Sequence, residues 1–512
     1  MKLGVDFGTT RTVVAHADRG NYPVVSFLDE RGDASDWFPS VVAERGGELF
    51  FGFEALALGE TGVVVRSFKR LLSDPGAVPG KPVSVGSVTL GLGELIRRFL
   101  LALREALETR SNLKSQATTA LRSVVAVPAN AHAAQRLVTL EAFRAAGFAP
   151  AAMLNEPSAA GFEYTHRHRT TLTSKRDQVV VYDLGGGTFD ASLVRMRGNR
   201  HEVLATAGIN QLGGDDFDDV LVDLVCDAAS LSRAELNQRA LERLVSQCRD
   251  AKERLNPSSR KIAIDLEHVL EQPHPEVTLP VARFYEACTP LVERSIEAMV
   301  PVMTRLEAAP EGAPDDLAGI YVVGGASELP IVARALRDRF GRRVHRSPYP
   351  SAAIAIGLAI ACDDEAGFEL ADRYSRTFGV FREGAAGSEI TFDPIFTSET
   401  ALPEVRGAGA GATVRFRRDY RAAHNVGHFR FLECSTVGED GRPRGDMTVS
   451  GDVLFPFDPR LGDVGDLRGV EVQRMGEGPH IEEEYSLDEN GIVAVTIRNV
   501  DLGYEREYRL GA

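Results

Sequence analysis

The chain has 512 residues, of which 44% are hydrophobic and 26% are charged. This length exceeds what one hydrophobic core organises, so we expect about three domains of ordinary globular composition. The formal net charge of −15 is compatible with simple solubility. It argues against a nucleic-acid or anionic-membrane partner, because contact with many phosphates requires a basic surface.

The cysteine pattern and the start of the chain both favour a cytoplasmic protein. Five cysteines are scattered without any CxxC pair, which predicts neither a disulfide framework nor a zinc site. Met1 and Lys2 lead directly into a short apolar run, so we expect no signal peptide. No segment reaches about eighteen uninterrupted apolar residues, so we expect no membrane-spanning helix.

The first predicted element is a short strand that ends in Asp6. Gly8, Thr9 and Thr10 follow as a turn, and a second apolar run begins at Thr12. Residues 179–190, VVVYDLGGGTFD, repeat this order of strand, acid, glycine-rich turn and threonine. An internal repeat at this spacing indicates two similar lobes that face each other across a cleft.

The chemistry of the second copy is that of an anion site beside a cation. Gly185, Gly186 and Gly187 allow their N–H groups to converge on a phosphate. Asp183 and Asp190 flank the turn and could hold a hydrated cation. Glycine turns are common and most bind nothing. The phosphate interpretation is favoured because the chain contains two copies of this pattern.

Two residues between the copies allow two interpretations each. Lys69 belongs either to a solvated basic face or to a lysine that enters the phosphate cleft. Glu156 follows a predicted strand and opens a predicted helix. It is either a helix-start acid favoured by the helix dipole or a group that orients water.

Further glycine pairs mark the rest of the α/β region. Gly213 and Gly214 precede acids at a predicted helix start. Gly324 and Gly325 join a predicted strand to a predicted helix, which is a second potential anion site. Residues 232–255 predict one long amphipathic helix. From residue 376 onward, short alternating runs and turn signals predict an all-β domain, most simply a sandwich.

These motifs, in this order, resemble the 70-kDa heat-shock chaperone family of the DnaK type. The resemblance is closer over residues 1–362 than over 370–512, and it rests on VDFGTT, FKRLL, VVAVPA with AAQR, NEPSAAG, YDLGGGTFD, LGGDDFD, YVVGG and AAIAIGLA. It implies an α/β actin-like (ribonuclease-H-like) ATPase with a C-terminal β-sandwich. The implied divisions are lobe I (1–178), lobe II (179–362), a linker (363–375) and a peptide-binding-like sandwich (376–512).

The resemblance also implies roles for the matched residues, with ATP, magnesium and potassium as cofactors. The metal would be held by Asp6, Asp183 and Asp190, and Pro128 and Arg136 match positions that relay the nucleotide state. The implied catalytic residues are Lys69, Glu156, Asp183 and Thr188. The implied nucleotide-binding residues are Gly8, Thr9, Thr10, Gly185, Gly186, Gly187, Thr188, Gly213, Gly214, Lys252, Gly324 and Gly325.

The residues at the positions that bind adenine in the family depart from the family pattern. Family members sandwich adenine between two arginines, and these positions carry Glu253 and Glu328 here. Arg249 replaces a glutamate, so a sign-swapped i,i+4 pair with Glu253 is expected. Asn256 replaces a serine, and Ser351 replaces an aspartate near the base. Loss of two guanidinium faces predicts weaker nucleotide binding or weaker adenine selectivity.

The linker and the C-terminal region depart as well. Residues 363–374, DDEAGFELADRY, lack the acid-then-leucine run by which the family docks its linker, so normal coupling of the halves is not assured. We expect no helical lid over the β-domain, and hence fast peptide exchange. The implied partners are unfolded or extended polypeptide, J-domain proteins and nucleotide-exchange co-chaperones.

Three functions are compatible with this pattern. The first is an ATP-dependent chaperone that hydrolyses ATP between the lobes, binds polypeptide and assists protein folding. The second is a nucleotide-binding regulatory module of the same fold with weak or no ATP turnover, which the altered adenine pocket favours. The third, a small-molecule kinase of the same superfamily, is disfavoured by the β-domain and by the lack of a recognisable sugar pocket.

Overall fold

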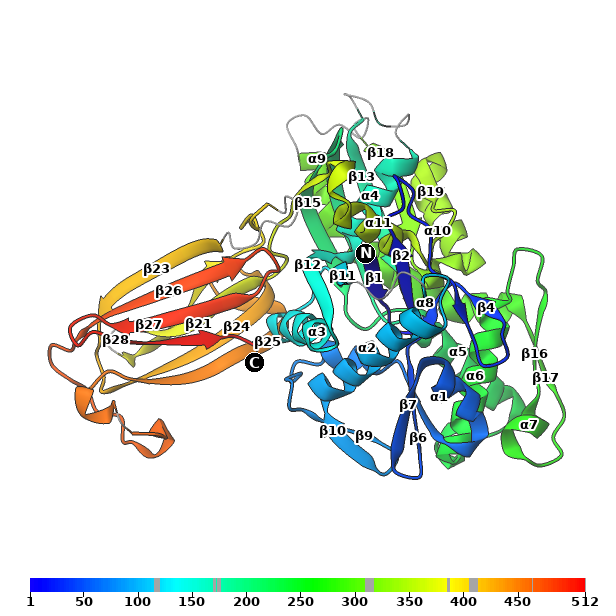
Figure 1. Cartoon of the computed structure of the whole chain (residues 1–512), viewed down its shortest axis with the longest axis horizontal. Coiled ribbons are helices and arrows are strands. Elements are labelled where there is room, and N and C mark those ends of the chain that lie inside the picture. Colours follow the sequence, from blue (N-terminus) through cyan, green and yellow to red (C-terminus); the bar gives the residue numbers. More distant parts are fainter. Residues whose placement is uncertain are drawn as a thin grey trace.

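Two mixed sheets organise the N-terminal part of the chain. The computed structural model describes residues 1–114, 120–168, 172, 176–308, 317–384, 387–404, 413–462 and 464–511. The first sheet has five strands in the order β12-β11-β1-β2-β5 (Figure 1). Its bounds are β1 (Lys2–Phe7), β2 (Arg11–His16), β5 (Phe38–Pro39), β11 (Leu121–Val127) and β12 (Phe148–Asn155).

The second sheet has six strands in the order β19-β18-β13-β14-β15-β20. Its bounds are β13 (Gln178–Leu184), β14 (Phe189–Arg197), β15 (Arg200–Ile209), β18 (Leu317–Val323), β19 (Val344–Arg346) and β20 (Glu369–Ala371). Each sheet contains an antiparallel hairpin, β1–β2 or β13–β14, whose turn is one of the two glycine-rich repeats. The structure therefore contains the internal repeat that the sequence predicts.

Helices and small hairpins surround these sheets. The helices are α1 (Gly52–Leu58), α2 (Leu92–Thr109), α3 (Ala133–Ala145), α4 (Glu156–Arg167), α5 (Gly214–Ala229), α6 (Gln238–Glu253), α7 (Leu266–Leu270), α8 (Val281–Ala298), α9 (Val300–Ala308), α10 (Pro330–Phe340) and α11 (Ala353–Cys362). The peripheral strands are β3 (Phe27–Leu28), β4 (Ala34–Ser35), β6 (Val41–Arg45), β7 (Glu48–Phe51), β8 (Val63–Arg66), β9 (Pro82–Val85), β10 (Val88–Gly91), β16 (Lys261–Ile264) and β17 (Val277–Pro280). None of the described helices is long and apolar enough to cross a bilayer.

α4 and α11 pack in one hydrophobic cluster with residues of both sheets, including Val13 and Val181. The two helices touch closely, since a Cβ on Gly357 would lie 1.8 Å from the carbonyl oxygen of Ala159. α11 also lies against β1, because a Cβ on Gly4 would meet the Ala355 carbonyl at 2.2 Å. These small-residue helices therefore form a central layer that belongs to both predicted lobes.

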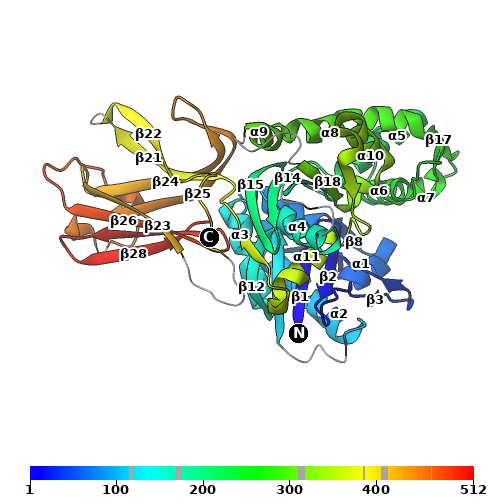
Figure 2. The same ribbon diagram turned by 90° about the horizontal axis from the view of Figure 1, so that it is seen from above.

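The C-terminal part consists of two four-stranded antiparallel sheets, β22-β21-β24-β25 and β23-β26-β27-β28 (Figure 2). Their facing side chains form one core, with Phe378 and Phe431 from the first sheet and Tyr485 and Val495 from the second. The predicted α/β region followed by an all-β region is confirmed at this level. The bounds are β21 (Thr377–Gly384), β22 (Glu389–Phe396), β23 (Thr413–Arg421), β24 (Val426–Val437), β25 (Pro443–Pro456), β26 (His480–Asp488), β27 (Val493–Asn499) and β28 (Tyr504–Arg509).

The segment expected to be a linker is partly a strand. β20 extends the second sheet by pairing in parallel with β15, where Glu369 lies opposite Arg200. Beyond it, the β-sandwich contacts α3 and β12 (Figure 1). Glu433 accepts a hydrogen bond from the Ala133 N–H at 3.0 Å, and Asn490 Oδ1 accepts one from the Met153 N–H at 3.0 Å. The two parts of the chain are therefore joined by buried polar contacts.

Candidate functional site

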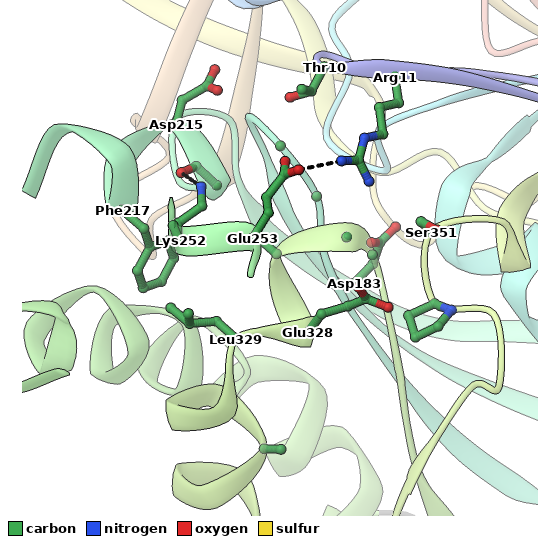
Figure 3. Close-up of a pocket in the computed structure, with 18 of the residues that line it drawn as sticks. Thr10, Arg11, Asp183, Asp215, Phe217, Lys252, Glu253, Glu328, Leu329 and Ser351 are labelled. Carbon is green, nitrogen blue, oxygen red and sulfur yellow. Dashed lines mark hydrogen bonds and ion pairs between the residues drawn. The ribbon is translucent and has the colours of Figure 1, made fainter. Parts of the chain in front are cut away.

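A cavity of about 910 Å³ lies between the two glycine-rich hairpins. Figure 3 shows residues from both sheets and from α6 projecting into it. Most predicted site residues line it, namely Asp6, Gly8, Thr9, Thr10, Lys69, Glu156, Asp183, Gly185, Gly186, Thr188, Gly214, Lys252, Gly324 and Gly325. The other three, Gly187, Gly213 and Asp190, are not among the lining residues.

The two glycine turns face each other at contact distance. A Cβ on Gly186 would lie 2.4 Å from Thr10 Oγ1, and one on Gly187 would lie 2.7 Å from Thr9 Oγ1. Only glycine permits this approach. The start of α5 is held against the same turn, because the Gly214 N–H donates to the Gly185 carbonyl at 2.9 Å. A Cβ on Gly213 would meet Gly187 N at 2.5 Å, so Gly213 supports the turn from behind.

Buried carboxyl groups gather beside these turns. Burial, followed by the charge of Glu156, raises the pKa of Asp6 to about 7 and that of Asp190 to about 8. Burial and the neighbouring acids raise the pKa of Asp183 well above its usual value. Neither oxygen of Asp183 has a hydrogen-bond partner among the described residues.

No three of the described His, Cys, Asp or Glu side chains are arranged to hold a metal ion directly, so this donor set fits a divalent cation that keeps its water shell. Carboxylate oxygens are the ligands that magnesium prefers, and a metal ion would compensate charges that burial makes unfavourable. Gly324 makes room for the acid, since it has a φ of 86° and its Cβ would lie 2.4 Å from Asp183 Oδ1. Asp190 lies opposite Asp183 on the neighbouring strand β14, and its Oδ1 accepts from the Ala129 N–H at 3.0 Å.

Lys69 provides the cationic group of this cluster. It lies on a 3-10 segment, Phe68–Ser73, and is only 6% exposed, which rules out the solvated-face interpretation. Its Nζ is 3.1 Å from Glu156 Oε1. Glu156 is the first residue of α4, so it is a helix-start acid and also faces the cavity. The two sequence interpretations of Glu156 are therefore compatible.

At the other end of the cavity, the expected pair between Arg249 and Glu253 is not formed. Arg249 instead donates to Asp218 at 2.9 Å and to Asp215 at 2.8 Å. Lys252 Nζ donates to the Gly214 carbonyl at 2.6 Å and lies 2.6 Å from Asp218 Oδ1. The helical spacing predicted a local pair, but the buried acids of α5 provide better-positioned partners.

Two arginines at this end were not recognised in the sequence. Arg11 lies 2.5 Å from Glu253, and Arg346 lies 3.2 Å from Glu328. All four residues line the cavity. The sequence could have indicated Arg11 as a site residue, because it directly follows Thr9 and Thr10. No sequence pattern indicated Arg346, since its strand joins the site only through the pairing of β19 with β18.

Two comparisons with known proteins found matches to this chain. A family model described as Hsp70 protein matches residues 94–380. The Chaperone protein DnaK of Mycoplasmopsis agalactiae (strain NCTC 10123 / CIP 59.7 / PG2) is 28% identical over 515 residues, which cover 98% of this chain and 78% of that protein. The family model covers more than half of the chain, and the similarity extends through its β-domain: the chain belongs to the Hsp70 family.

Proposed function

We propose that this protein is a magnesium-dependent ATPase of the chaperone type, with ATP bound between two actin-like lobes. The observation that carries this proposal is the contact between two glycine-rich hairpins beside Asp183, whose buried carboxylate has no partner among the described residues. A polyphosphate and a metal ion are the ligands that would use both features. Membership of the Hsp70 family supports ATP as the nucleotide.

The residues have distinct proposed tasks. Asp6 and Asp183 hold the hydrated metal, and Asp190 supports them or a potassium ion. When bound there, a magnesium ion would neutralise negative charge on the phosphates. The phosphates are held by Thr9, Thr10, Gly8, Gly185, Gly186, Gly187, Thr188, Gly213, Gly214, Gly324 and Gly325.

Water activation is assigned to the buried ion pair. Glu156 orients the attacking water, and Lys69 fixes Glu156 while stabilising negative charge. Lys252 lies on the nucleoside side of the cavity, where its bond to the Gly214 carbonyl places it next to the glycine turn. Catalysis in this arrangement is mainly positioning and charge stabilisation.

We also propose that residues 1–178 and 179–362 form the lobes, that 363–375 link them to the sandwich, and that 376–512 bind extended polypeptide. The pairing of β20 with β15 and the bond from Ala133 to Glu433 give this linkage a physical basis. J-domain proteins and nucleotide-exchange factors are the proposed co-chaperones.

The test is steady-state phosphate release with magnesium and ATP, with and without an unfolded polypeptide. Wild-type protein should release phosphate, and polypeptide should stimulate it. Lys69→Ala should lower turnover by on the order of 100-fold, as for the loss of one transition-state donor. Lys81→Ala is the matched control, because Lys81 pairs with Asp74 at 2.7 Å outside the cavity. Unchanged turnover in Lys69→Ala would show that the catalytic assignment is wrong.

A second candidate is a nucleotide-dependent binding module without productive turnover. The observation that favours it is the presence of Glu253 and Glu328 at the nucleoside end of the cavity. ATP binding by calorimetry without measurable phosphate release would favour this candidate over the ATPase.

A further inference from the structure

Two glutamates at the nucleoside end of the cavity each hold an arginine from another part of the chain. Glu253, on α6, pairs with Arg11 of β2 at 2.5 Å. Glu328 pairs with Arg346 of β19 at 3.2 Å. Figure 3 shows Glu253 and Glu328 projecting into the same space, with Arg11 reaching Glu253 from the opposite lobe. The two pairs thus bring two guanidinium groups to one end of the cavity.

This arrangement changes the expectation drawn from the sequence. Glutamates at residues 253 and 328 suggested that the nucleoside end had lost its guanidinium groups. The structure instead pairs these glutamates with two arginines, supplied by β2 of the first sheet and β19 of the second, and Arg249, Arg334 and Arg337 also line the cavity. What has changed is the element that carries each arginine.

The charge balance of this end suits an uncharged ligand group. Each glutamate is neutralised by its arginine, so neither leaves an uncompensated negative charge beside the site proposed for the phosphates. Two uncompensated carboxylates would repel a polyphosphate at this distance. A paired guanidinium still offers its flat face, which stacks well on aromatic rings.

Arg11 already makes a contact of this kind. Its guanidinium carbon lies 4.8 Å from the ring centroid of Trp37. The Arg11 and Arg346 side chains are 31% and 42% exposed, so both can be reached by a ligand in the cavity. Glu253 therefore orients a guanidinium that Trp37 supports from the protein side.

We propose that Arg11 and Arg346, oriented by Glu253 and Glu328, flank the purine base and determine the base specificity of this site. The inference rests on the proposed function, because it assumes that a nucleotide occupies the cavity. It assigns the base contacts to Arg11 on β2 and Arg346 on β19, and not to positions 253 and 328, where the family resemblance implies them.

The test compares magnesium-ATP with magnesium-tripolyphosphate by isothermal titration calorimetry, since tripolyphosphate has no base. Arg11→Ala and Arg346→Ala should each weaken ATP binding about tenfold. Tripolyphosphate binding should weaken by a clearly smaller factor, because each alanine variant leaves only one glutamate unpaired, and Arg11→Lys should bind tripolyphosphate as wild-type protein does. Arg11→Lys keeps the charge but lacks the planar face, so it should bind ATP as weakly as Arg11→Ala.

The control is Arg98→Ala on α2, outside the cavity. Arg98 is also ion-paired, and its side chain is 46% exposed, close to the value for Arg346. It should leave both affinities unchanged. Trp37 is the single tryptophan of the sequence and gives a second measurement. Its fluorescence should respond to ATP but not to tripolyphosphate, and Arg11→Ala should abolish the response.

The possible failures are distinguishable. If wild-type protein binds no ATP, the proposed function is wrong and this inference falls with it. If wild-type protein binds ATP but neither alanine variant weakens it, only the base assignment is overturned. An equal loss of tripolyphosphate affinity would show that these arginines contact phosphates, which also overturns the base assignment.

Discussion

His201 shows how burial fixes the charge state of a single side chain. It is fully buried on β15, and its ring stacks on Phe162 with centroids 4.7 Å apart. Burial lowers the pKa of His201 to about 3. The unfolded chain protonates this histidine below pH ~6.5, while the folded protein keeps it neutral. The free energy of unfolding therefore falls as the pH falls from about 6.5 toward 3.

We expect His201→Leu to reduce this pH dependence. Wild-type protein should lose about 1.4 kcal/mol per pH unit through this residue once the pH is below ~6. Because leucine does not titrate, the variant should lose less stability over the same interval. Urea unfolding at pH 7, 6 and 5 measures the difference. His274→Leu, in the loop before β17, is the control, and equal slopes for the two variants would contradict the role of His201.

The elements that were predicted best are those whose sequence motifs are contiguous in the chain. The turns after Asp6 and Asp183 follow from strand, acid and glycine in direct succession, and the structure has both hairpins. The helix predicted over 232–255 is wrong at its start, because α6 begins at Gln238. Asn237 caps it by accepting from the Ala240 N–H at 2.9 Å, a signal that was present in the sequence.

Other features depend on contacts that no local pattern contains. β20 was missed because it has three residues and its partner β15 lies far away in the chain. The partners of Arg249, Glu253 and Glu328 were missed because spacing along one helix does not show which side chains another element brings close. The candidate site was thus predictable at its glycine turns and not at its nucleoside end.

The contact of α4 with α11 leads to a prediction at the same scale. Gly357→Ala should lower the free energy of unfolding by about 1–3 kcal/mol, because its Cβ would meet the Ala159 carbonyl at 1.8 Å and separate the helices. Gly93→Ala on α2 is the matched control, since its nearest neighbour lies 3.4 Å away. That substitution should be stabilising by about 0.5–1 kcal/mol.

Denaturant unfolding measures the change in the free energy of unfolding for both glycine variants. Equal effects at the two positions would mean that the helices can move apart freely. Loss of stability only in Gly357→Ala would support close packing of the central layer.

Across the whole molecule, Arg136 connects the N-terminal α/β part to the β-sandwich. It is 2% exposed and donates to the Asn490 carbonyl at 3.2 Å and to Asn155 Oδ1 at 2.7 Å. Asn155 in turn donates to Asp372 at 3.0 Å and directly precedes Glu156. A continuous polar path therefore runs from the sandwich through Arg136 and Asn155 to the residue proposed to orient water, and Asn155 also connects this path to the linker.

We expect Arg136→Ala to separate the unfolding of the two parts. Its removal leaves the buried Asn155 Oδ1 and Asn490 carbonyl without this donor, which should lower stability by about 1–3 kcal/mol for each of them. Scanning calorimetry should show one transition for wild-type protein and two for the variant. Arg498→Ala, which removes a surface pair with Glu482 inside the sandwich, should keep the single transition. A single, unshifted transition in Arg136→Ala would contradict this linkage.

β20 affects how the chain can be divided into fragments. It covers the outer edge of β15 at residues 200–202. Uncovered strand edges are templates for pairing with other chains and promote aggregation. A fragment cut after Cys362 would expose this edge, whereas one extended through Ala371 would carry its own edge protection.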